Sequence, residues 1–253
     1  MTGALTAQAR QSFDRDGYLI ARGLFTVEEA RAHAAWIDEL VKRPPTIGNE
    51  MVYFEDSLKE PGTRVLSRIE RFAEHHEGLG SLVADRRILD TVSTLLDDEP
   101  VLFKEKINFK MPGGGGFTPH QDIQPGWDAY APYFLSVLIA VDRNTIENGC
   151  LELAAGHHRR GLIGRKWEPL EGVELDGLTF EAFPMEPGDA AFFDCFTPHQ
   201  SQPNQTLQPR RNIYLTYNRR RDGDFREQYF ADKRKSYPPD FERDSSRRYS
   251  FRV

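Results

Sequence analysis

The sequence predicts a mainly β protein with a helical amino-terminal part. Helical periodicity runs through most of the first hundred residues, and at Val101 it changes to strict alternation of apolar and polar side chains. Beyond that point, many short apolar runs are separated by glycine and proline turns, which is typical of a sandwich or a jelly-roll barrel. We therefore expect one domain over residues 1–253, with mostly helical support over 1–100, a jelly-roll core over 101–220 and a tail over 221–253 that packs on the core.

The composition argues against several classes of partner. A net charge of −6 gives no reason to expect nucleic acid or an anionic membrane. The two cysteines, Cys150 and Cys195, lie in apolar runs, which predicts buried thiols and no disulfide framework. Residues 1–4 do not begin a signal peptide, and the longest apolar run, within Tyr133–Val141, is too short to span a bilayer. We expect a soluble, cytoplasmic protein, either a monomer or a homodimer.

Helix signals dominate the amino-terminal part. Residues 6–15 are expected to form a short helix that Gly17 ends, and residues 18–21 a brief strand. A capping box at Thr26–Glu29 begins the next helix, which Pro44-Pro45 end. The apolar stripe of that helix consists of Ala30, Ala34, Ile37 and Val41.

The segment between this helix and residue 101 is less regular. Thr46–Gly62 shows no period, which predicts a long loop that could serve as a lid over a binding site. The spacing of Val65, Ile69 and Phe72 predicts another helix, and the apolar positions of residues 81–96 predict a further one. His75-His76 lie in a polar segment and are expected to face solvent.

Strict alternation begins at residue 101. Apolar side chains occupy one predicted face, with Val101, Phe103, Ile107 and Phe109. The other face has Lys104, Lys106, Asn108 and Lys110. Two interpretations of that polar face stay open: it faces solvent, or it points into a small barrel and lines a site for an anion. The later strands are expected at Phe134–Val141, Cys150–Leu153, Leu178–Pro184, Ala190–Phe193 and Ile213–Tyr217.

Three residues form a pattern of metal ligands. His120 and Asp122 are two positions apart, so on an extended strand both side chains leave the same face. His199 follows a hydrophobic run, Asp189–Asp194, that is expected to be a buried strand. Two histidines and one carboxylate on one side of a metal leave the opposite positions open, as in non-heme Fe(II) oxygenases.

Longer motifs around these residues resemble a known family. His120-Gln121-Asp122, Asn148–His158, Gly188-Asp189 and the stretch from His199 to Arg210 are similar to the phytanoyl-CoA dioxygenase (PhyH) superfamily. The resemblance covers roughly residues 7–220, and the local pattern at 106–110 and 209–213 is similar to the ectoine hydroxylase branch. It implies a double-stranded β-helix, which is a cupin-like jelly-roll, flanked by α-helices. It also implies a dioxygenase that uses Fe(II), 2-oxoglutarate and O2.

The resemblance assigns cofactor roles to particular residues. The metal ligands fall on His120, Asp122 and His199, and the arginine that binds the far carboxylate of 2-oxoglutarate falls on Arg210, with Arg211 as the adjacent alternative. A permanently charged, planar guanidinium suits that carboxylate. Further cosubstrate contacts are assigned to Asn108, Ser201, Lys104 and Gln121. Lys104 stands where the ectoine branch has glutamine, which argues against ectoine itself as the substrate.

The substrate site is expected at Trp127, Tyr130, Lys106 and Phe117, close to the ligand strand. The aromatic residues there suit a hydrophobic core equally well. The resemblance implies hydroxylation of an unactivated C–H bond of a small polar metabolite or natural-product intermediate, with release of succinate and CO2. Asp122 favours hydroxylation over halogenation, because related halogenases replace this carboxylate by a small residue. We expect the substrate to have a carboxylate or a phosphate group. The alternative is a barrel of the same ancestry that binds a small molecule without turnover.

Two other groups of residues suggest chemistry less strongly. His157-His158 could be additional metal ligands, but they fall where the family has a structural turn. Cys195 and His199 could form a nucleophile pair, but nothing near them in the sequence supplies an oxyanion hole.

Overall fold

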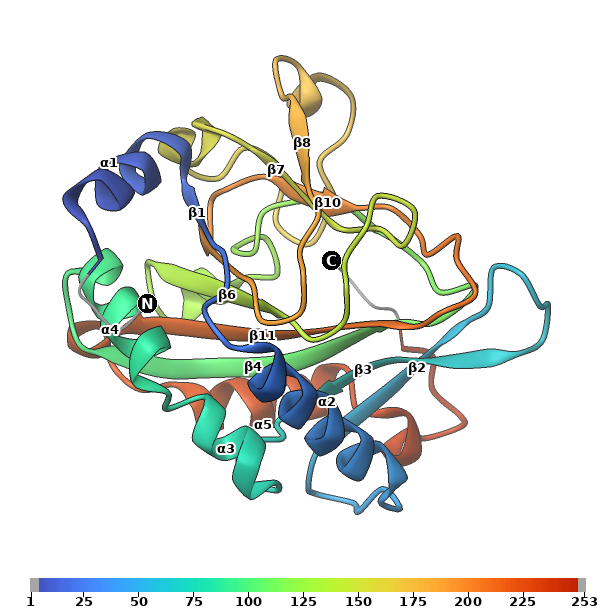
Figure 1. Cartoon of the computed structure of the whole chain (residues 1–253). Coiled ribbons are helices and arrows are strands. Elements are labelled where there is room, and N and C mark those ends of the chain that lie inside the picture. Colours follow the sequence, from blue (N-terminus) through green and yellow to red (C-terminus); the bar gives the residue numbers. More distant parts are fainter. Residues whose placement is uncertain (1–4, 250–253) are drawn as a thin grey trace.

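Two β-sheets face each other in the computed structural model, which describes residues 5–249, and helices cover the outer side of the larger sheet (Figure 1). The larger sheet has seven strands, and all its pairs are antiparallel. In spatial order they are β1 (Tyr18–Ala21), β9 (Ala190–Asp194), β6 (Phe134–Ala140), β11 (Arg210–Arg219), β4 (Pro100–Lys110), β3 (Arg64–Glu70) and β2 (Met51–Asp56).

The smaller sheet has four antiparallel strands. Their order is β5 (Phe117–His120), β10 (His199–Ser201), β7 (Leu151–Ala154) and β8 (Phe180–Phe183). This pair of sheets confirms the predicted jelly-roll core, and the strands expected after residue 130 are all present, with bounds shifted by a few residues. Strand β6 is buried along its whole length, because it lies in the middle of the larger sheet between two layers.

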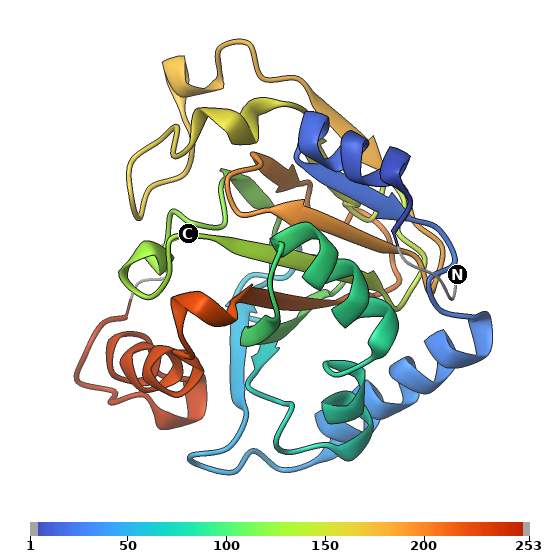
Figure 2. The same cartoon turned by 90° about the vertical axis from the view of Figure 1, so that its left-hand side faces the viewer.

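Five α-helices are present among residues 5–249, and α2, α3 and α5 lie together on the outer side of the larger sheet (Figures 1 and 2). They are α1 (Ala7–Asp16), α2 (Val27–Lys42), α3 (Glu77–Leu82), α4 (Arg86–Leu96) and α5 (Arg226–Ser236). The described residues contain no helix that is both long and apolar enough to cross a membrane. Helix α5 contacts β4, and its Tyr229 and Phe230 are buried.

Helix α2 begins at the predicted capping box. The Thr26 hydroxyl accepts a hydrogen bond from the Glu29 amide at 3.2 Å, and the Glu29 carboxylate accepts one from the Thr26 amide at 2.8 Å. Ala30 and Ile37 are buried as predicted, but Val41 is 44% exposed and Leu40 takes the core position instead. The buried stripe is therefore rotated by about one residue at the end of this helix.

Three predictions in the amino-terminal part are wrong. Residues 51–56 and 64–70 form the hairpin β2–β3, not part of a loop and a helix, because β3 pairs with the free edge of β4. The predicted helix over 81–96 is two helices, since Asp85 caps α4 by accepting a hydrogen bond from the Arg87 amide. His76 is buried, where its Nδ1 accepts a hydrogen bond from the Leu79 amide and caps α3.

A β-bulge changes the predicted faces of β4. Phe103 is an extra residue in the pairing of β4 with β11, because its two neighbours face consecutive residues of β11. It packs against Trp127 in a second hydrophobic cluster, while Ile107 and Phe109 lie in the main core. The prediction of one shared apolar face from Val101 to Phe109 is therefore wrong, since an extra residue reverses the alternation.

Candidate active site

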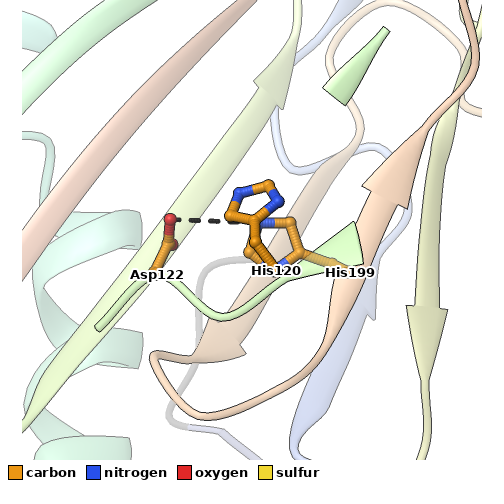
Figure 3. A group of neighbouring side chains, drawn as sticks. All are labelled: His120, Asp122 and His199. Carbon is orange, nitrogen blue, oxygen red and sulfur yellow. Dashed lines mark ion pairs between the residues drawn. The ribbon is translucent and has the colours of Figure 1, made fainter. Parts of the chain in front are cut away.

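His120, Asp122 and His199 lie together at one end of the smaller sheet (Figure 3). His120 ends β5 and His199 begins β10, and the two residues are direct partners in the pairing of these strands. Asp122 comes from the turn that follows β5, so the prediction that it extends from the same strand as His120 is wrong. One possible ligand atom from each of the three side chains lies within 4.8 Å of the other two.

Hydrogen bonds orient both imidazoles. The Nδ1 atom of His120 donates to the Thr118 carbonyl at 2.7 Å, and that of His199 donates to the Thr197 carbonyl at 3.0 Å. These bonds place the proton on Nδ1 and leave Nε2 as the free lone pair for a metal. The Nε2 atom of His199 lies 3.8 Å from Asp122, whose other carboxylate oxygen accepts a hydrogen bond from Ser136.

The charge states of the group suit a divalent metal. Burial, and to a smaller extent neighbouring His199, lower the pKa of His120 to about 3. Burial also lowers the pKa of His199. Burial raises the pKa of Asp122, but His199 and Lys106 outweigh that effect, so the net pKa is below its usual value. Two neutral imidazoles and one carboxylate result, and this donor set with open positions is the one that non-heme Fe(II) enzymes use.

A second polar cluster contains two buried cations, Arg210 and Lys110. They are partners at the start of β11 and the end of β4, and each is 1% exposed. Lys110 donates to the Ser201 hydroxyl at 2.7 Å, and both cations donate to the Gly149 carbonyl. Within residues 5–249, neither forms an ion pair with a carboxylate, and the Nε atom of Arg210 has no hydrogen-bond partner.

This cluster has the charge and the burial that suit an anionic ligand. Burial, and to a smaller extent the nearby Arg210, lower the pKa of Lys110 to about 6. Burial likewise lowers the pKa of Arg210. A bound carboxylate would compensate both charges. The sequence assigned Arg210 and Ser201 to this role but not Lys110, although an anion site was one of the two open interpretations of the polar face of β4 to which Lys110 belongs.

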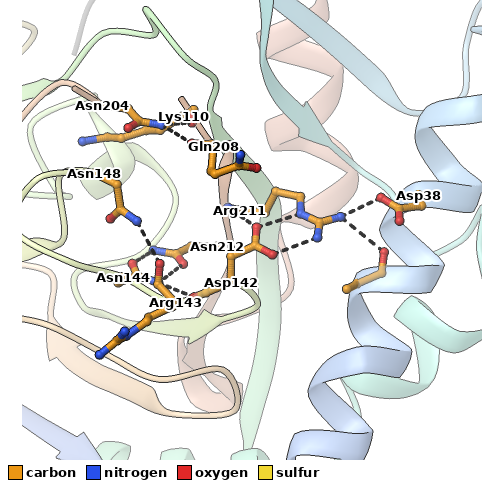
Figure 4. A network of polar contacts seen from close by, with 11 residues as sticks. Asp38, Lys110, Asp142, Arg143, Asn144, Asn148, Asn204, Gln208, Arg211 and Asn212 are labelled. Atoms are coloured by element: carbon orange, nitrogen blue, oxygen red, sulfur yellow. Dashed lines mark hydrogen bonds and ion pairs between the residues drawn. The ribbon is translucent and has the colours of Figure 1, made fainter. Parts of the chain in front are cut away.

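Arg211 lies in a network of polar contacts that includes Asp142 and Asp38 (Figure 4), so its surroundings differ from those of Arg210. Its side chain donates two hydrogen bonds of 2.8 Å to Asp142 and one of 2.6 Å to Asp38 on α2. These two carboxylates already compensate its charge, and they raise the pKa of the guanidinium. Arg211 therefore joins β11 to α2, whereas Arg210 donates to the Gly149 carbonyl and has no carboxylate partner within residues 5–249.

The remaining predicted cosubstrate residues are placed differently. Asn108 is buried, and its Oδ1 atom has no hydrogen-bond partner within the described chain. Lys104 precedes Lys110 by six positions on β4, about 20 Å along an extended strand, so it lies far from Arg210. The Gln121 side chain donates to the Gly161 and Phe196 carbonyls and accepts from the Ile163 amide. Its role at the cosubstrate stays a prediction that this arrangement does not support.

A cavity of about 580 Å³ adjoins the candidate metal ligands. It is lined by His120 and Asp122 and by all four residues that were predicted to contact substrate, which are Trp127, Tyr130, Lys106 and Phe117. Trp127 is only 3% exposed, so it belongs to the second hydrophobic cluster and to the cavity wall at once. Within the described chain, no residue of 46–62 lines this cavity, so the predicted lid has no support from it.

The cavity wall is strongly cationic. Arg68 and Lys233 also line it, but both contact the buried carboxylate of Glu70, at 2.8 and 2.6 Å. Lys104 donates to the Tyr229 hydroxyl at 2.9 Å, and Lys106 forms no hydrogen bond or ion pair with residues 5–249. Burial, and to a smaller extent Lys104, lower the pKa of Lys106 to about 7. An anionic group in the cavity would raise the lowered pKa of both lysines.

Several cavity residues were missed by sequence reasoning. Arg68 comes from a strand that was predicted to be a helix, and Tyr229, Asp232 and Lys233 come from α5 in the tail. No local motif marks them, because they reach the site only through packing of α5 on β4. By contrast, the Cys195 thiol is buried and its pKa is raised well above the usual value, so a nucleophile pair with His199 is not supported.

Comparisons with known proteins agree with this site. The family model described as phytanoyl-CoA dioxygenase (PhyH) matches residues 13–212. Methylphosphonate hydroxylase from Gimesia maris is 37% identical over 94% of this chain and 90% of its own length. A 2-aminoethylphosphonate dioxygenase from uncultured bacterium HF130_AEPn_1 is 34% identical over 97% of this chain and 94% of its own. The crystal structure of EctD from S. alaskensis with 2-oxoglutarate and 5-hydroxyectoine has a TM-score of 0.73 at 26% identity, over 87% of this chain and 78% of that one.

Proposed function

Because the chain belongs to the phytanoyl-CoA dioxygenase (PhyH) family and is an Fe(II)- and 2-oxoglutarate-dependent dioxygenase, we propose that it hydroxylates a small organophosphonate at a carbon next to phosphorus. The observation that supports this substrate class is that Lys104 and Lys106 form no ion pair within residues 5–249 and line a cavity that also contains His120 and Asp122. Two relatives that align over nearly the whole chain are named for phosphonate substrates, which supports the same class.

In this proposal His120, Asp122 and His199 hold Fe(II), since their Nε2 atoms and carboxylate converge. Arg210, Lys110 and Ser201 hold the far carboxylate of 2-oxoglutarate, because they form a buried cationic cluster without a carboxylate partner. When bound, iron and 2-oxoglutarate supply the activation of O2 and the oxidative decarboxylation to succinate and CO2. The protein's part is to orient both reactants and to exclude water.

The phosphonate end of the substrate is assigned to Lys104 and Lys106. A phosphonate has up to two negative charges and three acceptor oxygens, which matches two ammonium groups that act as point charges. Phe117 and Tyr214 flank Lys106, with ring centres 5.9 and 5.0 Å from its Nζ atom, so the ammonium is held without being neutralised. Binding of the dianion would therefore raise the lowered pKa of Lys106 and fix the reacting C–H bond beside the metal.

The alternative of a binding protein without turnover is set aside. All three metal-type side chains and the arginine assigned to 2-oxoglutarate are present, and a pure binder has no physical need for all four. The relatives that align over most of the chain are named as hydroxylases or dioxygenases.

The test is substrate-dependent succinate release with Fe(II), ascorbate and 2-oxoglutarate, for matched phosphonates, carboxylates and sulfonates. Phosphorus NMR would identify the hydroxylated product. We expect turnover of phosphonates only, and a Lys106→Met variant should raise KM for the phosphonate roughly tenfold or more while keeping 2-oxoglutarate binding. The control is Lys166→Met, which removes an exposed lysine that pairs with Asp128. Preference for carboxylates or sulfonates, or equal effects of both variants, would contradict the proposal.

A further inference from the structure

Helix α5 places one carboxylate in this otherwise cationic cavity. Asp232 and Asp122 are the acidic side chains of the described chain that line it, and Asp122 belongs to the metal group. Asp232 is half-buried and accepts a hydrogen bond of 3.1 Å from the Tyr130 hydroxyl. It forms no ion pair with any residue of 5–249, since its neighbour Lys233 contacts Glu70 instead.

The surroundings of Asp232 are aromatic. Tyr130 packs edge-on against Tyr229 with ring centres 5.8 Å apart, and it also contacts Phe103 at 5.5 Å. Trp127 and Tyr237 belong to the same cavity wall. The Asp232 carboxylate provides electrostatic attraction, and the ring of its partner Tyr130 provides a cation–π contact, which together are the chemistry that recognises an alkylammonium group.

The cationic and acidic groups line one cavity and are connected through two tyrosines. Lys104 donates to the Tyr229 hydroxyl at 2.9 Å, and Asp232 accepts from the hydroxyl of Tyr130, whose ring packs on Tyr229. Two adjacent tyrosines thus separate the cationic part of the cavity from the acidic part. The cavity volume of about 580 Å³ falls within the range of roughly 300–1,000 Å³ for sites that enclose whole ligands, which leaves room beyond a one-carbon phosphonate.

We propose that Asp232, together with Tyr130, binds the ammonium group of an aminoalkylphosphonate whose phosphonate group lies at Lys104 and Lys106. This inference rests on the proposed function and makes it narrower: the substrate is a zwitterion with opposite charges at its two ends. Asp232 is then a residue that determines specificity, and it takes no part in the chemical step.

The test compares 2-aminoethylphosphonate with propylphosphonate, which has nearly the same shape but a methyl group in place of the ammonium. Each is titrated anaerobically by calorimetry into enzyme loaded with Fe(II) and 2-oxoglutarate. We expect the unmodified enzyme to bind the amino compound about tenfold more tightly. The Asp232→Asn variant should lose this preference to within about twofold, because only the ion pair is removed.

Glu227→Gln is the matched control, since Glu227 lies on the same helix, is 74% exposed and pairs with Arg71 outside the cavity. It should keep the preference. Retention of the preference in Asp232→Asn would overturn the inference, and so would equal weakening of both ligands. If the unmodified enzyme binds neither phosphonate and releases succinate with neither, the proposed function itself fails. If it binds both equally and hydroxylates both, only the role of Asp232 fails.

Discussion

Replacing Arg210 with methionine should weaken 2-oxoglutarate binding without destabilising the protein. Arg211→Met is the matched variant, in which stability should fall and 2-oxoglutarate affinity should be kept. The two arginines are neighbours on β11, but Arg210 is 1% exposed and has no carboxylate partner within residues 5–249. Arg211 is joined to Asp142 and Asp38 by hydrogen bonds of 2.6–2.8 Å. We therefore expect Arg210, and not Arg211, to bind the far carboxylate of 2-oxoglutarate.

The magnitudes follow from these surroundings. Loss of a charge-assisted contact in a buried site costs about 2–5 kcal/mol, so Arg210→Met should weaken 2-oxoglutarate binding by roughly 30-fold to several thousandfold. The same change removes a buried charge next to Lys110, so the empty protein should be as stable as before or more stable. Arg211→Met should keep the affinity within about twofold but cost about 1–3 kcal/mol of stability, because Asp142 loses its partner.

Two measurements check this pair. Anaerobic calorimetry with Fe(II)-loaded protein gives the dissociation constant for 2-oxoglutarate, and urea unfolding of the empty protein gives the stability. The reasoning is refuted if Arg211→Met loses cosubstrate affinity while Arg210→Met retains it. It is also refuted if Arg210→Met destabilises the empty protein by as much as Arg211→Met does.

Three further predictions use other parts of the molecule. His199→Ala should abolish stoichiometric Fe(II) retention in an anaerobic titration, and unchanged stoichiometry would sink the ligand assignment. Trp127→Ala should lower the free energy of unfolding in urea by about 3–5 kcal/mol, because the Trp127 side chain is 3% exposed. Trp127→Phe should keep the fold but raise the share of succinate release that yields no hydroxylated product. If Trp127→Ala is as stable as the unmodified protein, Trp127 does not belong to the core. The pKa of Glu29 is lowered from 4.5 to about 2, mainly by Arg87, so its contribution to stability is present above pH 4.5 and is lost as the pH falls towards 2. Because Glu29 is 38% exposed, this contribution is about 1 kcal/mol or less. The free energy of unfolding should change less with pH between 4.5 and 2 in Glu29→Gln than in the unmodified protein. The same pH dependence in both proteins would contradict this prediction.

Local signals in the sequence predicted many elements well. The capping box at Thr26–Glu29 begins α2, and the continuous apolar run beginning at Phe134 is the buried strand β6. Both signals work because the interaction that they report lies within a few residues or depends on burial alone.

Elements that depend on distant partners were predicted less well. The spacing of Val65, Ile69 and Phe72 fits a helix, but the segment is strand β3 because the edge of β4 offers it hydrogen bonds. Glu70, at the end of that strand, is fully buried, which its sequence neighbours do not suggest. Its charge is compensated by Arg68 and by Lys233, and the second of these comes from α5, far along the chain.

The sequence by itself determined the class of chemistry, since two histidines, a carboxylate and an arginine at the family's spacings indicate Fe(II) and 2-oxoglutarate. Only the tertiary structure decided the surroundings of these residues. The register of β11 puts Arg210 with Lys110 and turns Arg211 towards α2, and the packing of α5 on β4 brings Asp232 into the cavity. The physical reason is separation along the sequence. The spacing of the metal ligands is set within short segments of one or two strands, so it is visible in the sequence. The cavity wall forms where distant segments pack together, and that packing depends on how the whole chain buries its apolar surface.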